Sequence, residues 1–291
     1  MEVIEGLKKH MENICDISMT LDMSDYTGYC KFELTQDAIA RLAEASRPRA
    51  DYVQDNLSKL GYNPVSIDIE YKNTTGKNVF AANGKGPFTF FICHHDYWAG
   101  KGADDNGSGM AIILELAKQL QGKENIAFAS FDFEECGLQG SYNFSKHYDN
   151  TNIANLICLD SVASAPRVIY CNAILNKDHD GIYPLVNTEA SPGLINELKQ
   201  AKKDVAYDME SGYLMGFNMD LMSFTKDVAK TGIISVHPEG KYIDQLMKGK
   251  PSGNLHTQND VLENVIYDNL EGVTKTLLTY MNNRDISKKA A

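Results

Sequence analysis

In the middle of the chain, short continuous runs of hydrophobic residues alternate with segments whose hydrophobic residues have helical spacing. Residues 88–93 (FTFFIC), 125–133 (NIAFASFDF) and 154–160 (ANLICLD) are apolar runs typical of strands buried on both faces. Residues 107–121 and 138–149 have the spacing of helices. Strands that alternate with helices in this way predict a largely parallel sheet covered on both faces.

The flanking regions extend this pattern less regularly. We expect helices at 35–60, 193–203, 219–230 and 261–281, and strands at 65–71, 77–83 and 232–236. Three regions, 172–192, 204–218 and 237–255, lack clear periodicity, and we expect them to be irregular walls or lids of a functional site. The length suits a single catalytic domain over residues 1–291, in which 1–34 form an N-terminal extension.

Composition narrows the class of protein. A hydrophobic content of 43% and a charged content of 23% are those of a globular domain. The 28 basic residues are outnumbered by 39 acidic ones, which argues against nucleic acid as a partner. The amino terminus has no apolar run long enough for a signal peptide or a membrane span, and the six cysteines form no CxxC pair. We therefore expect a reduced, cytoplasmic protein.

Ionisable side chains follow three predicted strands at the points where these strands end. Asp or Asn before a helix is commonly a cap, and paired glutamates commonly form a solvated turn. Three such strand ends at one edge of a parallel sheet nevertheless indicate a ligand site, because that edge is where α/β proteins bind ligands. The residues concerned are His94, His95, Asp96, Asp104, Asp105, Glu134, Glu135 and Asp160.

Carboxylates gathered in this way repel one another unless a cation lies between them. A mixture of histidine and carboxylate without cysteine pairs favours a catalytic site of the zinc type. A further imidazole is expected from His256, in the loop GNLHTQND, and His237 is its rival. Asp260 and Glu263 have the spacing of a helix capping box, which predicts a structural role for Asp260.

These motifs together resemble the co-catalytic zinc aminopeptidases. The resemblance is carried by His94-His95-Asp96, GADDNGSG (102–109), FDFEECGLQGS (131–141), LD (159–160) and LHTQND (255–260), which occur in this order within residues 35–285. The group is the bacterial leucyl aminopeptidase and glutamate carboxypeptidase family of the zinc exopeptidase clan. The resemblance implies an α/β fold, a three-layer α/β/α sandwich around a mixed, largely parallel central sheet.

The same resemblance implies a role for each residue of the site. Two zinc ions per chain are expected, with Co²⁺ or Mn²⁺ able to replace them. His94 and Asp160 would hold one ion, Glu135 and His256 the other, and Asp104 would bridge them. Glu134 would be the general base, and Asp96 would orient His94. The resemblance also implies an unusual peptide bond between Asp104 and Asp105.

One departure concerns the substrate pocket. The family pattern SDHxPF is replaced by MDLMSF at 219–224, so that Asp220 and Phe224 correspond and the histidine does not. Tyr213 is a candidate oxyanion donor. Tyr213, Asp220 and Phe224 are therefore expected to bind substrate. Tyr97, Trp98, Phe217 and Phe224 are candidates for an apolar pocket wall, with packing in the core or on the surface as the alternative.

The expected activity is removal of the amino-terminal residue from peptides that have a free amino terminus. A carboxypeptidase of the same fold would need a basic clamp, for which Arg167 and Lys226 are the candidates. A glutaminyl cyclase of this fold is the other close alternative. More distant alternatives are a cysteine hydrolase that uses Cys93 or Cys136 and a non-catalytic binding module.

Overall fold

A mixed sheet forms the centre of the protein. The structure, a computed structural model, describes residues 2–23, 34–163, 168–178, 181–187, 192–207, 210–215, 220–224, 232–238 and 255–290. The strand order within this part is β10-β8-β11-β7-β4-β6-β3-β2, with β9 paired to β8. The strands are β2 (Val65–Tyr71), β3 (Thr74–Asn83), β4 (Phe88–His94), β6 (Ile126–Phe131), β7 (Ile153–Leu159), β8 (Val168–Asp178), β9 (Gly181–Asn187), β10 (Glu210–Met215) and β11 (Gly232–Pro238).

The central strands are parallel and the outer ones are mixed. β4 pairs in parallel with both β6 and β7, and β7 pairs in parallel with β11. β3 is antiparallel to β6, and β8 is antiparallel to β11. Every residue of β4 and β6 is buried, which explains why both read as continuous apolar runs.

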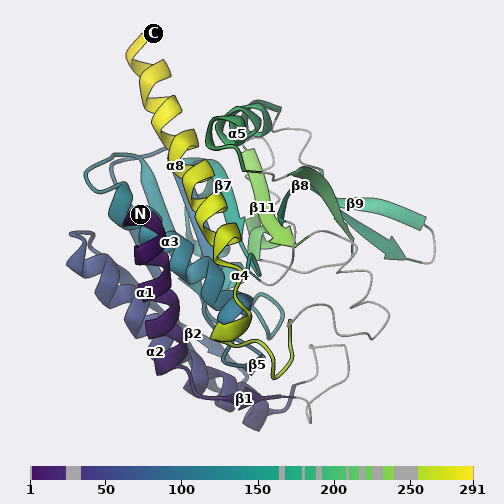
Figure 1. The fold of residues 1–291 in the computed structure, drawn as a ribbon. Coiled ribbons are helices and arrows are strands. Elements are labelled where there is room, and N and C mark those ends of the chain that lie inside the picture. Colours follow the sequence, from purple (N-terminus) through teal and green to yellow (C-terminus); the bar gives the residue numbers. More distant parts are fainter. Residues whose placement is uncertain are drawn as a thin grey trace.

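Helices cover both faces of the sheet. On one face α1, α3 and α8 lie side by side, with α5 against α8 (Figure 1). On the opposite face α4 packs with the short helix η6. The helix bounds are α1 (Glu2–Ile17), α2 (Gln36–Lys59), α3 (Gly109–Gln119), α4 (Gln139–His147), α5 (Pro192–Val205), η6 (Asp220–Phe224), η7 (Leu262–Asn264) and α8 (Tyr267–Ala290). This arrangement is the three-layer sandwich that the sequence predicts.

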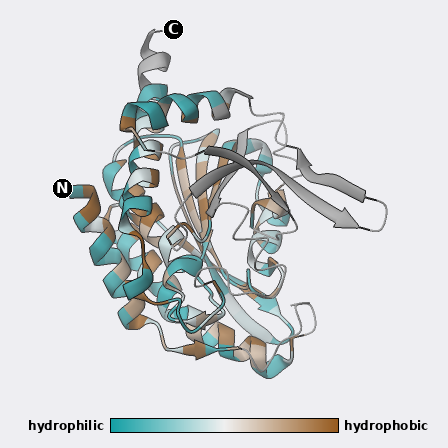
Figure 2. Ribbon diagram, turned by 45° about the vertical axis from the view of Figure 1, so that its right-hand side comes forward, coloured by the Kyte–Doolittle hydropathy of each residue, from teal (hydrophilic) through white to brown (hydrophobic). Residues whose placement is uncertain are grey.

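The two faces of the sheet each have their own apolar core. The larger cluster joins α1, α2, α3, α5 and α8 to the sheet, and the smaller one joins α4 and η6 to its other face. Figure 2 shows the consequence: hydrophobic positions gather on the inner strands and inner helix faces, while the outer faces of the helices are mainly hydrophilic. Within the described ranges, no helix has the length and apolar character needed to cross a membrane.

Two expectations about secondary structure are wrong. Strands β8, β9 and β10 occupy parts of the regions 172–192 and 204–218, which we expected to be irregular. The final helix begins at Tyr267 and not at 261, because the short helix η7 precedes it. Of the helix expected at 219–230, the described residues contain only η6. Residues 237–255 lie almost entirely outside the described part.

Two separate contacts join the amino-terminal segment to the rest of the fold. Leu7, Met11 and Ile14 of α1 are fully buried in the larger core cluster. Beyond α1, the two-residue strand β1 (Leu21–Asp22) pairs antiparallel with β5 (Ala99–Gly100). This second contact lies in the connection between β4 and α3, which carries part of the candidate site.

Candidate metal centre

The candidate site forms where three neighbouring parallel strands end. His94 is the last residue of β4, Glu134 and Glu135 follow β6, and Asp160 directly follows β7. Because β4 lies between β6 and β7, these side chains start from adjacent points on one edge of the sheet. The sheet topology thus explains why residues 66 positions apart in the sequence can meet.

Two groups of side chains meet at this edge and share one carboxylate. His94 Nε2 lies 3.2 Å from Asp105 Oδ1 and 3.6 Å from Asp160 Oδ1. His256 Nε2 lies 2.9 Å from Asp105 Oδ2 and 3.1 Å from Glu135 Oε1. Within each group the potential ligand atoms all lie within 4.8 Å of one another. Asp105 therefore presents one oxygen to each group, which is the arrangement of a bridging ligand.

The expectation for Asp104 is wrong, because the shared carboxylate belongs to its neighbour. Asp104 turns away and accepts a hydrogen bond from the backbone amide of Ala163. The backbone changes direction sharply here, with Gly102 in the left-handed region and Asp105 outside helical geometry, so the two aspartates point to different sides. The unusual peptide bond is a cis bond between Asp105 and Asn106, and not between Asp104 and Asp105.

Asp260 was expected to cap the last helix, but its carboxylate holds the turn at the site. It accepts hydrogen bonds from the backbone amides of Asp104, at 2.6 Å, and Asp105, at 3.1 Å. Since α8 begins only at Tyr267, Asp260 lies too far upstream to cap it. The sequence pattern of a capping box here coincides with a different structural role.

Asp96 belongs to neither metal group but contacts residues of the site. Its carboxylate oxygens accept hydrogen bonds from the amides of Glu134, at 3.1 Å, and Glu135, at 3.0 Å. Asp96 Oδ1 also lies 3.4 Å from His94 Nδ1, whose closest acceptor is the Asp96 carbonyl at 3.1 Å. One buried aspartate thus contacts both the imidazole and the backbone amides of the glutamate pair.

The charge balance of the cluster fits a bound divalent cation. Burial lowers the pKa of His94, but the carboxylates of Glu134, Asp105, Asp160 and Asp96 outweigh it and hold that pKa well above its usual value. His94 Nε2 is buried and makes no hydrogen bond of normal geometry to any described residue. A cation at this point would satisfy the imidazole nitrogen and offset the carboxylates. Two imidazoles with several carboxylates form a donor set suited to zinc.

The three candidate substrate-binding residues have different outcomes. Phe224 is 1% exposed, and its ring packs against Phe90 and Phe131 in the core, so the expected pocket role is wrong. Tyr213 lies on β10, and its side chain is outside the described part. Asp220 is buried, and neither of its oxygens makes a normal hydrogen bond to a described residue. Burial raises the pKa of Asp220 to about 7.

Two of the remaining aromatic candidates, Trp98 and Tyr97, are described by the structure, and both are buried. Trp98 is 7% exposed, and its ring centroid lies 6.1 Å from that of His256. Tyr97 is 1% exposed and packs into the fold, so it lines no open pocket wall. Phe217 lies outside the described residues.

The structure disfavours the cysteine hydrolase. Cys93 and Cys136 are fully buried, and burial raises the pKa of the Cys93 thiol to about 12, which disfavours a reactive thiolate.

His237, the rival of His256 as a metal ligand, lies on β11, and its side chain is outside the described part. Arg167 and Lys226, the candidates for a carboxylate clamp, also fall outside the described residues.

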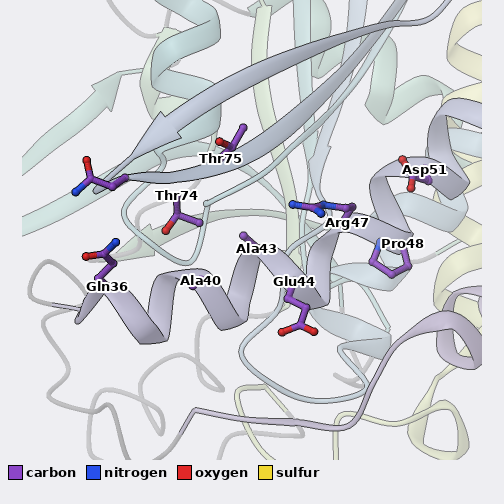
Figure 3. A pocket seen from close by; sticks show the side chains of 10 residues that line it. Gln36, Ala40, Ala43, Glu44, Arg47, Pro48, Asp51, Thr74 and Thr75 are labelled. Carbon is purple, nitrogen blue, oxygen red and sulfur yellow. The ribbon is translucent and has the colours of Figure 1, made fainter.

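A groove elsewhere on the molecule is unrelated to this cluster. It has a volume of about 580 Å³ and lies between α2 and the turn that joins β2 to β3 (Figure 3). Its lining includes the charged residues Glu44, Arg47 and Asp51 from α2. None of its lining residues belongs to the two candidate metal groups.

Comparison with solved structures places the fold among zinc exopeptidases and related enzymes. A glutaminyl cyclase from Porphyromonas gingivalis superposes with a TM-score of 0.71 at 17% identity, covering 97% of this chain and 98% of that chain. BSAP, a zinc aminopeptidase from Bacillus subtilis, superposes with a TM-score of 0.57 at 18% identity, covering 74% of this chain and 51% of that chain. At these identities the likeness shows the fold, which confirms the predicted α/β class.

Sequence comparison gives shorter matches to curated relatives. Aminopeptidase YwaD of Bacillus subtilis is 34% identical over 86 residues, which are 26% of this chain and 19% of that protein. A relative from Pyrenophora tritici-repentis is 41% identical over 69 residues, and the chain spans only 16% of its length. The family model of peptidase family M28, by contrast, matches residues 78–281 and so includes every residue of the two metal groups. The chain therefore belongs to peptidase family M28.

Proposed function

We propose that the protein is a zinc-dependent aminopeptidase that holds two metal ions. The observation that carries this proposal is the Asp105 carboxylate, which has one oxygen 3.2 Å from His94 Nε2 and the other 2.9 Å from His256 Nε2. His94, Asp105 and Asp160 would hold one ion, and Asp105, Glu135 and His256 the other. When bound, zinc would polarise the substrate carbonyl and lower the pKa of a water molecule.

Glu134 is the proposed general base. Glu134 is only 7% exposed. The Asp96 carboxylate accepts hydrogen bonds from the backbone amides of both Glu134 and Glu135. The Glu134 carboxylate would accept a proton from the water that attacks the peptide carbonyl. As the carbon–nitrogen bond breaks, it would donate that proton to the leaving amine.

The same acidic surroundings favour an amino-terminal substrate. Glu134 belongs to neither metal group, so its carboxylate would keep its charge after bound cations offset the ligand carboxylates. A free α-ammonium group would be attracted to this carboxylate, whereas the terminal carboxylate of a peptide would be repelled by it. We therefore propose peptides with a free amino terminus as substrates, with Asp220 and Tyr213 as candidate contacts.

The test compares three reactions on one set of peptides with metal-free and zinc-loaded protein. An aminopeptidase releases single residues from a free amino terminus and leaves acetylated peptides intact. A carboxypeptidase shortens the acetylated peptides from the other end. A glutaminyl cyclase, the activity named for the Porphyromonas gingivalis structure, releases ammonia from an amino-terminal glutamine without shortening the chain. Full activity without any divalent metal would contradict the proposal, and either of the last two products would replace it.

A further inference from the structure

The connection between β4 and α3 determines the geometry of the candidate site. His94 stands at its beginning, Asp96 follows, and Asp105 lies near its end. Residues 95–105 therefore set the distance between the imidazole of His94 and the carboxylate that both metal groups share. These residues form no regular structure apart from β5 and the turn that contains Asp105, so other parts of the protein must hold them in place.

Arg49 of α2 holds the first part of this connection. It is 0% exposed, and its guanidinium donates to the carbonyls of His95, at 3.4 Å, Gly102, at 2.8 Å, and Lys101. Its central carbon lies 4.0 Å from the ring centroid of Tyr97. Burying a charged group is costly unless its donors are satisfied. Here most of its acceptors belong to the connection itself, so the loop conformation and the buried charge depend on each other.

Asp260 holds the second part from the opposite direction. Its carboxylate binds the amides of Asp104 and Asp105, and its carbonyl accepts from the Lys101 amide at 2.8 Å. Arg49 thus binds carbonyl groups of the connection and Asp260 binds amides. The charges of Asp260 and Asp105 also favour the charged form of Arg49, whose pKa burial lowers.

The amino-terminal segment supports Arg49 on its remaining side. Ser18 Oγ accepts from Arg49 Nε at 2.7 Å and donates to the Ile14 carbonyl at 2.6 Å. The Ser18 carbonyl accepts from Lys101 Nζ at 2.6 Å, and Tyr97 donates to the Met19 carbonyl at 2.9 Å. The residues that directly follow α1 therefore contact both the guanidinium and the loop that the guanidinium holds.

We infer that Arg49 is a positioning residue for the metal centre, which sets the place of Asp105 relative to His94 through the carbonyls of residues 95, 101 and 102. This inference rests on the proposed function, since it concerns the same metal site. Arg49 is not in either metal group, so it acts through the loop. Its planar fork of donors suits several carbonyl acceptors, which the single ammonium of lysine cannot bind together.

The test uses Arg49→Lys, with Arg47→Met as the matched control. Arg47 lies two positions away on the same helix and is exposed. For each full-length protein we would measure zinc affinity by competition with a coloured chelator, the visible spectrum of the cobalt-loaded protein, and thermal unfolding of the metal-free form. We expect Arg49→Lys to lower zinc affinity roughly 10–100-fold and to shift the cobalt spectrum, as loss of an orienting group does. Arg47→Met should match the wild type.

An Arg49→Lys protein that is less stable yet binds zinc and cobalt like the wild type would overturn the inference. If Arg49→Lys does not fold, Ser18→Ala replaces it, because it removes the acceptor of Arg49 Nε and otherwise only a local hydrogen bond to the Ile14 carbonyl. An unchanged cobalt spectrum and zinc affinity in Ser18→Ala would then overturn it. None of these measurements needs a substrate, so failure of the proposed function is distinguishable: a wild type with another activity would still show the effect of Arg49→Lys on zinc, and a wild type without the metal site would bind no zinc stoichiometrically.

Discussion

At the scale of single residues, Glu134 and Glu135 are adjacent but are assigned different roles. Glu135 Oε1 lies 3.1 Å from His256 Nε2, whereas Glu134 belongs to neither metal group. Glu134→Ala should therefore retain both zinc ions and lose turnover by roughly 10²–10⁴-fold, the usual contribution of a positioned base. Glu135→Ala should lose zinc affinity.

Zinc content and turnover measured together on both variants check this assignment. Most of the loss in Glu134→Ala should appear in kcat and less in KM. A zinc-depleted Glu134→Ala beside a zinc-loaded Glu135→Ala would reverse the two roles, and full activity in both would exclude the site.

Asp104 and Asp105 form a second matched pair. Asp105→Asn should weaken zinc binding at both positions, by at least about 100-fold, because the shared charge is a direct ligand in the proposal. Asp104→Asn should keep its zinc and cost about 1–2 kcal/mol of stability, since Ala163 then donates to a neutral acceptor. Equilibrium dialysis against zinc, with urea unfolding alongside, compares the two. Equal zinc loss in both variants would show that the conformation of the turn, and not the Asp105 carboxylate alone, determines zinc affinity.

The sequence could identify this pair but not the correct member of it. The motif GADDNGSG has acidic residues before α3, and the family resemblance implies a bridging carboxylate among them. Which aspartate faces the metals depends on the backbone between Gly102 and Asn106, which is fixed by Asp260 from 156 positions downstream. Arg49 was missed for a similar reason, because an arginine in an amphipathic helix gives no sign that it is fully buried.

At the scale of elements, the predicted central strands are the most accurate part. β4, β6 and β7 are buried on both faces, so their burial alone produces a readable apolar run. β8, β9 and β10 lie toward the edge of the sheet, where packing on neighbouring strands and not periodicity determines the structure. The sequence therefore predicted the strands that carry His94, Glu135 and Asp160 and missed those at one end of the sheet.

The contact between α1 and α2 should make stability depend on pH. His10 of α1 lies 2.9 Å from Tyr52 Oη of α2, and burial, with Lys118 and Lys9, lowers the pKa of His10 from 6.5 to about 4. A lowered folded pKa means that the unfolded chain binds the proton first, so stability falls as pH drops from 6.5 towards 4. The free energy of unfolding should therefore fall less between pH 7 and pH 4.5 in His10→Gln than in the wild type. The difference should be about 1–2 kcal/mol, after allowance for the partial exposure of the ring.

Urea unfolding at the two pH values measures this difference, with His147→Gln as the control. His147 is exposed on α4, so His147→Gln controls for replacing a histidine outside the contact between α1 and α2. An identical pH dependence in His10→Gln and the wild type would contradict the prediction.

At the scale of the whole molecule, metal removal should destabilise the protein. Without a cation, the buried carboxylates of Asp105, Glu135 and Asp160 repel one another and hold His94 charged. Zinc at 100 times its Kd would add about 2.7 kcal/mol per site, so chelation should lower Tm by roughly 5–10 °C. Differential scanning calorimetry with chelator, and then with zinc or magnesium restored, measures this change. Zinc should restore Tm and magnesium should not; an unchanged Tm after verified metal removal would count against the site.

The pairing of β1 with β5 and the contacts of Asp260 have a consequence for the order in which the protein acquires its metals. Leu21 pairs with Gly100, 79 positions later, and Asp260 binds the amide of Asp104 across 156 positions. Contacts this distant in the chain close slowly, and the last of them cannot exist until residue 260 has left the ribosome. A nascent chain that already displays His94 and Asp105 therefore still lacks the partner that fixes the turn between them. We expect tight zinc capture to begin only after residue 260 has emerged from the ribosome.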